Sequence, residues 1–241
     1  MMKVLALDTS NRPLTAAVLD GNQLLATTTI TTERKHAAFA LPLVAELLER
    51  AHLQPTDLDR VVVANGPGSY TGLRVAVTIG KVLATTLKIQ LVGISSLATL
   101  ALNFSDTNRL IVPLFDARND LVFSGVYQTE PAGLKTVLLD RHVAFSRWIL
   151  ELQKFHDNLL FVGQDTLHFV DQIKESFPTA VVVSGPKALP QAGELGLAGQ
   201  KQAVVTDVDH FVPRYLRLTQ AEADWQREHP GEEQHNYVEH L

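Results

Sequence analysis

The order of predicted strands and helices, which occurs twice along the chain, restricts the fold more than any other feature of the sequence. Residues 1–105 begin with three strand patterns, KVLALDTS, TAAVLD and QLLATTTIT, followed by helix, strand, helix, strand and helix patterns. Residues 106–227 again begin with three strand patterns, RLIVPLFDAR, DLVFSGVYQT and GLKTVLLDR, followed by α/β segments. An antiparallel meander followed by crossovers predicts an α/β protein of two related lobes, each with a mixed sheet flanked by helices.

A polar break at 105–109 separates the two halves, so we expect a first lobe over 1–105 and a second over 106–227. The final helical segment of the second half is expected to return to the first lobe. The tail, residues 228–241, is rich in His and Glu and is predicted to be disordered.

Composition excludes several classes of function. The chain has 241 residues, a formal net charge of −5 and no cysteine. Disulfides, thiolate catalysis and cysteine-ligated zinc are therefore excluded, and the overall charge does not attract nucleic acid. The acidic Asp8 comes too early for a signal peptide, and no apolar run approaches the roughly 20 residues that span a bilayer. We therefore expect a cytoplasmic protein without a membrane segment.

A glycine-rich turn follows the strand VVVAN and resembles a phosphate-binding loop. The sequence lacks the Lys-Ser/Thr pair of a Walker A loop, and Gly66, Gly68 and Gly72 have the spacing G-x-G-x-x-x-G, which is not that of a dinucleotide fold. Pro67 also removes an amide donor. The favoured interpretation is a tight strand-to-helix turn formed by Gly66, Pro67, Gly68 and Ser69, and phosphate binding is the alternative.

A second candidate phosphate turn, Asp8-Thr9-Ser10, follows the first strand. An acid at a strand end followed by hydroxyls is typical of the start of actin-like ATPases and sugar kinases, in which such a turn holds phosphates. Those enzymes favour glycine where this chain has Asn11, Arg12 and Pro13. The residues leave a vestigial turn and a working one as open alternatives. No histidine spacing indicates a metal site.

Two predicted helices carry unusual apolar patterns. In the helix at 71–88, small residues recur every four positions at Gly72, Ala76, Gly80 and Ala84. Small residues at this spacing allow close approach either to the chain's own sheet or to a helix of another subunit. The helix at 36–52 is apolar on nearly every face, which favours a contact with another subunit.

Several segments together resemble the TsaB (YeaZ) family over about residues 1–225. These are LALDTS, GPGSYTGLRVAVTIGK, VGISSLATLA, FDAR and PRYLRLTQAEADW, in the order and spacing of that family. The resemblance implies an actin-like ATPase (ribonuclease H-like) fold whose catalytic equipment has decayed.

It also implies a non-catalytic subunit that dimerises with TsaD, with the ATPase TsaE joining the pair. TsaD transfers a threonylcarbamoyl group to the adenosine next to the anticodon of tRNAs that read A-starting codons. The resemblance further implies homodimers through the same helices, only indirect tRNA contact and no cofactor, since ATP and magnesium belong to the partner subunits. An active ATPase or phosphotransferase is the alternative function, and a peptidase has the least support.

Carried onto this chain, the resemblance places the partner interface on the helices at 36–52 and 71–88. The residues assigned to it are His36, Phe39, Ala40, Leu43, Val44, Leu47, Gly72, Leu73, Ala76, Val77, Gly80, Lys81 and Ala84.

Overall fold

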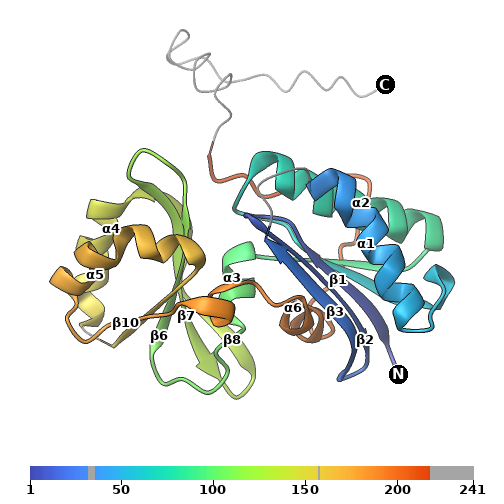
Figure 1. The fold of residues 1–241 in the computed structure, drawn as a ribbon, viewed down its shortest axis with the longest axis horizontal. Coiled ribbons are helices and arrows are strands. Elements are labelled where there is room, and N and C mark those ends of the chain that lie inside the picture. The colour runs from blue at the N-terminus through green and yellow to red at the C-terminus, as the bar shows by residue number, and fades with distance from the viewer. Residues whose placement is uncertain (32–35, 157, 218–241) are drawn as a thin grey trace, which may run out of the picture.

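The computed structural model describes residues 1–31, 36–156 and 158–217. Within these residues the chain forms two lobes, each built on a five-stranded sheet (Figure 1). The tail at 228–241, predicted to be disordered, lies outside the described residues.

The two sheets have the same topology. The first has the order β3-β2-β1-β4-β5 and is formed by β1 (Lys3–Asp8), β2 (Pro13–Asp20), β3 (Gln23–Thr31), β4 (Arg60–Ala64) and β5 (Gln90–Ile94). The second has the order β8-β7-β6-β9-β10 and is formed by β6 (Leu110–Asp116), β7 (Leu121–Glu130), β8 (Gly133–Ala144), β9 (Leu159–Val162) and β10 (Val181–Val182). In each, three antiparallel strands are followed by two strands parallel to the first of them. The predicted actin-like ATPase (ribonuclease H-like) fold is therefore confirmed.

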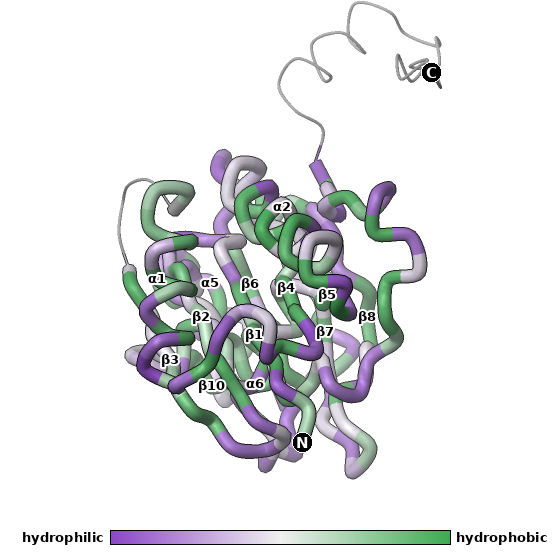
Figure 2. The backbone as a smooth tube through the Cα atoms, turned by 90° about the vertical axis from the view of Figure 1, so that its right-hand side faces the viewer, coloured by the Kyte–Doolittle hydropathy of each residue, from purple (hydrophilic) through white to green (hydrophobic). Residues whose placement is uncertain are grey.

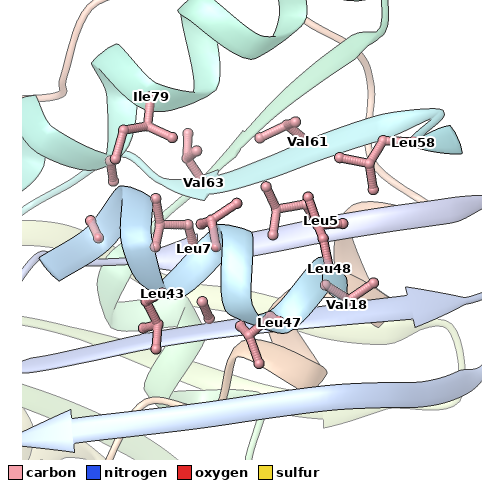
Figure 3. Packing of buried hydrophobic residues seen from close by; sticks show 14 of the residues in the cluster. Leu5, Leu7, Val18, Leu43, Leu47, Leu48, Leu58, Val61, Val63 and Ile79 are labelled. Atoms are coloured by element: carbon pink, nitrogen blue, oxygen red, sulfur yellow. The ribbon is translucent and has the colours of Figure 1, made fainter. Parts of the chain in front are cut away.

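Helices α1 (His36–Arg50) and α2 (Tyr70–Leu87) cover one face of the first sheet. Figure 3 shows Leu43, Leu47 and Leu48 of α1 lying toward the apolar side chains of the strands. Each helix connects two strands of the same direction, so both run antiparallel to β1 and begin at the sheet edge where β1 ends. Their N-terminal halves therefore lie at the same end of the lobe.

The second sheet is covered on one face by α4 (Phe145–Leu152) and α5 (Val170–Ser176). Short 3₁₀ segments complete the described helical structure, at Pro55–Asp57, Gln153–Phe155, Gln164–Phe169 and Gly185–Ala188.

Two helices cross between the lobes. Helix α3 (Ser96–Ala101), from the first half of the sequence, packs Leu97 and Leu100 against the second sheet. Helix α6 (Ala192–Gly199), from the second half, packs Leu195 against the free face of the first sheet. Both lie at the junction of the lobes (Figure 1). The predicted division of the chain at residue 105 therefore differs from its division by packing. In the packed structure, α3 joins the second lobe and α6 joins the first.

Residues 201–217, here called the C-terminal strap, return to the first lobe in a non-helical conformation. The amide of Val205 donates to the carbonyl of Leu91 in β5, at 2.8 Å. Lys81 binds the Asp209 carbonyl and Arg74 binds the Tyr215 hydroxyl, so the strap runs antiparallel to α2. Residues 218–227 of the predicted second lobe lie outside the described residues.

Hydrophobic residues follow α2 and much of the strands, and hydrophilic residues gather in the turns (Figure 2). None of the helices formed by the described residues is both long and apolar enough to cross a membrane.

Candidate functional site

The turn after β1 is buried beneath the start of α2. Asp8, Thr9 and Ser10 are almost completely inaccessible to solvent. The hydroxyl of Thr9 donates to the carbonyl of Gly72 at 2.6 Å, and the amide of Ser10 donates to Oδ1 of Asp8 at 2.7 Å. The carbonyl of Ser10 accepts from the amide of Ser69, also at 2.7 Å. The Thr9 hydroxyl and the backbone groups of Ser10 are thus bonded within the chain, whereas the buried hydroxyl of Ser10 has no hydrogen-bond partner among the described residues.

Three glycines allow this close contact between backbones. A Cβ atom at Gly72 would lie 2.0 Å from the carbonyl oxygen of Thr9, and one at Gly68 would lie 2.2 Å from that of Ser10. A Cβ atom at Gly66 would lie 2.3 Å from the carbonyl oxygen of Arg214 in the strap. Any side chain at these positions would displace a backbone segment, so the glycines are required by packing.

The segment Gly66-Pro67-Gly68-Ser69 forms the turn from β4 into α2. Gly66 and Gly68 have φ values of 125° and 157°, which favour glycine. The peptide bond between Gly66 and Pro67 is cis. Ser69 is the N-cap of α2, and its hydroxyl accepts from the amide of Gly72 at 3.3 Å.

The lobes meet directly beside the turn that follows β1. Nδ2 of Asn11 donates to Oδ2 of Asp165 in the second lobe, at 3.0 Å. The same oxygen accepts from the amide of Asp116, and Oδ1 of Asp116 accepts from the amide of Arg118. This contact joins the two lobes beside the turn that follows β1. Among the described residues, no group of three or more His, Asp or Glu is placed to hold a metal ion.

The small-residue face of α2 packs on the chain's own sheet. A Cβ atom at Gly80 would lie 2.8 Å from a methyl carbon of Val63 and 3.0 Å from one of Leu91, and Ala76 and Ala84 are buried. This packing corrects the assignment of Gly72, Ala76, Gly80 and Ala84 to a partner contact. The same burial leaves little exposed surface for the other predicted contact residues in the core, which are Ala40, Leu43, Val44, Leu47, Leu73 and Val77.

The remaining predicted contact residues have different positions. Phe39 is exposed on α1, and Lys81 is half-buried, with its Nζ donating to the carbonyl of Asp209 at 2.7 Å. His36 begins α1, and its side chain lies outside those described.

Helices α1 and α2 carry exposed apolar residues that were not predicted as contact residues from the sequence. Leu41 of α1 is 55% exposed and Val82 of α2 is 56% exposed, and Tyr70 is exposed at the start of α2. A surface hollow of about 540 Å³ adjoins α1 at its C-terminal end, lined by Ala45, Leu48, Glu49, His52, Leu53, Gln54 and Pro55. Helical spacing could have indicated Val82, because it lies away from the buried positions of α2. We use the name outer helix face for the four large apolar residues exposed on these two helices, Phe39, Leu41, Tyr70 and Val82.

Known proteins resemble the chain along most of its length. Residues 23–225 match the family model described as TsaD, tRNA N6-adenosine threonylcarbamoyltransferase. The tRNA threonylcarbamoyladenosine biosynthesis protein TsaB of Bacillus subtilis is 38% identical over 225 residues, covering 93% of this chain and 98% of that protein. The chain belongs to the TsaB (YeaZ) family. TsaB of Escherichia coli is 27% identical over 226 residues, which cover 90% of this chain and 95% of that protein.

A solved structure agrees with this assignment. YeaZ from Pseudomonas aeruginosa superimposes with a TM-score of 0.75 and 26% identity, covering 90% of this chain and all of that one. The predicted family resemblance is thus confirmed both by sequence and by fold.

Proposed function

We propose that this chain is a non-catalytic subunit that dimerises with a TsaD-type threonylcarbamoyltransferase in the cytoplasm, with TsaE joining the pair. In this role it supports threonylcarbamoyl transfer to the adenosine next to the anticodon of tRNAs that read A-starting codons. It contacts tRNA only through the complex and needs no cofactor, because ATP and magnesium belong to the partner subunits. Without its partner it forms a homodimer through the same surface.

The exposed apolar surface of α1 and α2 is the observation that carries this proposal. Phe39, Leu41 and Val82 are large apolar side chains, and each exposes about half of its surface to water on this pair of neighbouring helices. Large apolar side chains that gather on neighbouring surface elements can mark a site of association. We place the partner contact on this outer helix face.

The partner is a TsaD-type subunit because this chain itself matches the TsaD family model over residues 23–225. A subunit of the same fold has a counterpart of α1 and α2. A surface that pairs with its own counterpart forms two-fold dimers, either between identical chains or between related ones. The homodimer and the complex with TsaD would therefore compete for the outer helix face.

The hydrogen bonds that the turn after β1 makes within the chain support a non-catalytic role. Thr9 bonds to Gly72, Ser10 bonds to Asp8 and Ser69, and Asn11 bonds to Asp165 across the lobes. These bonds occupy the Thr9 hydroxyl, the Ser10 backbone and the Asn11 amide with partners of the chain itself.

The test combines binding with a modification assay. TsaD and TsaE of the same organism are mixed with tRNA, and modified adenosine is measured with and without this chain. We expect modification to rise when the chain is present and TsaD to co-purify with it. If this chain and TsaD form a complex that can be purified but modified tRNA does not rise, the result would contradict the proposed role.

A pair of matched variants tests the surface. Leu41→Asp places a carboxylate within the proposed contact, and we expect it to weaken TsaD binding at least about tenfold, equivalent to about 1.4 kcal/mol. Leu150→Asp is the control, because Leu150 is 65% exposed on α4 of the second lobe. Equal affinity of both variants for TsaD would exclude the outer helix face as the contact.

A further inference from the structure

The C-terminal strap is held on the first lobe by contacts along its whole length. Besides the bonds of Val205 to Leu91 and of Lys81 to Asp209, the amide of Arg214 donates to the carbonyl of Asn65 at 2.7 Å. The ring of Phe211 packs over Gly93 of β5, where a Cβ atom would lie 2.6 Å from the ring. The ring of Tyr215 stacks on that of Tyr70, with centroids 4.7 Å apart. The strap is therefore an integral part of the first lobe.

The end of the same strap is bonded to the second lobe. The guanidinium of Arg214 pairs with the carboxylate of Asp140 in β8, whose side chain is only 2% exposed. The guanidinium of Arg217 donates to the carbonyl of Ala117, beyond β6, at 3.1 Å. Leu216, between the two arginines, packs against the apolar cluster of α3, β6 and β7. Consecutive residues of one segment thus hold both lobes.

Asp140 is surrounded by donors from three parts of the molecule. Its carboxylate accepts from the hydroxyl of Ser95, the N-cap of α3, at 2.6 Å, and from the hydroxyl of Tyr127 in β7. Burial and the neighbouring carboxylate raise the pKa of Tyr127, so the phenol stays protonated and donates. Removing the Arg214 guanidinium would leave a buried carboxylate without its cation, which strongly disfavours the present arrangement.

We propose that the C-terminal strap is a clasp that holds the two lobes in one fixed arrangement, with Asp140 as its anchor in the second lobe. The clasp keeps the lobes closed on the Asn11–Asp165 contact beside the turn that follows β1. It also fixes the second lobe relative to α2, since Tyr215 stacks on the first residue of that helix. The inference does not depend on the identity of the partner.

The test measures the distance between the lobes in the full chain. Since the protein has no cysteine, Thr56→Cys in the first lobe and Leu150→Cys in the second can each carry a single spin label. Both positions are exposed. Labelled chain is diluted with unlabelled chain, so that distances between molecules do not contribute, and is measured by double electron–electron resonance. The chain with the native clasp should give one narrow distribution of the distance between the two spin labels.

Arg214→Met should broaden this distribution and shift it to longer distances. Arg50→Met is the matched control, because the ion pair of Arg50 with Glu46 lies within α1, and it should leave the distribution unchanged. Hydrogen exchange on the same samples should show that the amide of Val205 stays protected in Arg214→Met. Broadening together with loss of protection throughout both sheets would point to unfolding and count against the clasp.

Asp140→Asn provides a second variant that keeps the shape of the side chain and removes its charge. It should produce the same broadening as Arg214→Met. An unchanged distance distribution in both variants would overturn the proposal, because the lobes would then be held without the clasp.

Discussion

The hydroxyl of Thr9 and the carbonyl of Gly72 are joined by a hydrogen bond of 2.6 Å, and at the same point the Thr9 carbonyl lies against the Cα of Gly72. The first turn of α2 therefore packs directly on the turn after β1. Gly72, four positions before Ala76, serves this close contact within the chain and not a contact with a second subunit. The stability of the first lobe should depend on it.

Gly72→Ala should destabilise the protein by about 1–3 kcal/mol, the usual range for overpacking a tight site. The added methyl group would meet the Thr9 carbonyl oxygen at 2.0 Å, and backbone cannot move aside as a side chain can. Urea denaturation followed by circular dichroism measures the change. Gly193→Ala in α6 is the control, because its methyl group would meet Leu24 at an ordinary 3.5 Å. The control should be neutral or stabilising, since alanine favours a helix by up to about 1 kcal/mol over glycine. Equal losses in the two variants would show that Gly72 is not specially constrained.

ATP should not bind to this chain alone. The Thr9 hydroxyl and the Ser10 amide are bonded within the chain, and Asn11 bridges to Asp165 of the second lobe beside this turn. Titration calorimetry with millimolar ATP and magnesium should give no saturable heat, and Asp8→Asn should behave identically. A saturable heat in the native chain that disappears in Asp8→Asn would instead support the active ATPase.

The stability of the protein should fall as the pH drops below about 6.5, the usual pKa of histidine, in part because of His142. Desolvation, followed by the positive charge of Arg217, lowers the pKa of His142. Below the ordinary pKa the unfolded chain takes up a proton that the folded chain does not. The contribution of His142 is therefore fully present above that pH and is lost as the pH falls through the lowered pKa.

His142→Gln should reduce this acid sensitivity. Thermal unfolding at pH about 7.5 and about 5.5, on either side of the ordinary histidine pKa, measures the effect as the difference in Tm. His52→Asn serves as the control, because His52 is exposed and asparagine tolerates its left-handed backbone, with φ of 55°. A difference in Tm that stays the same in His142→Gln would remove His142 as a cause.

Val82→Asp should weaken self-association and TsaD binding together, since both are assigned to the outer helix face. Val181→Asp is the comparison, because Val181 is 40% exposed on the edge strand β10 of the second lobe and Val82 is 56% exposed on α2. Sedimentation velocity, with and without TsaD, measures both equilibria. Loss of one association without the other would mean that the homodimer and the heterodimer use different surfaces.

Periodic features of the sequence predicted the fold well. Alternating apolar residues and the Gly21-Asn22 pair indicated the β2–β3 hairpin, and the repeated order of strands indicated two lobes. Helix α6 was missed, because its sequence AGELGLAG contains three glycines that disfavour an isolated helix. Packing on the first sheet holds it instead: a Cβ atom at Gly199 would lie 2.4 Å from a methyl carbon of Val62.

The candidate site was only partly predictable. The four-residue spacing of small side chains in α2 indicated close packing but could not say against what: Gly72 packs on the turn after β1, and Gly80 packs on β4 and β5. The residues of the clasp that bond to the second lobe lie in the segment PRYLRLTQAEADW, which indicated the family, but an extended segment lacks periodicity and so did not indicate which residues it contacts. Asp140 sits in a strand of mixed polarity, and Arg214 lies 74 positions away, so only the fold brings them together.

The exchange of α3 and α6 between the lobes means that neither half of the sequence encodes a complete lobe. A fragment ending at residue 105 would lack α6 and would leave Val4, Ala6, Ala17 and Leu19 of the first sheet open to water. During synthesis from the N-terminus, this sheet face stays bare until residue 199 has been made. The whole chain must therefore be kept together when it is expressed, when it is truncated and as it evolves, although its topology is that of two lobes.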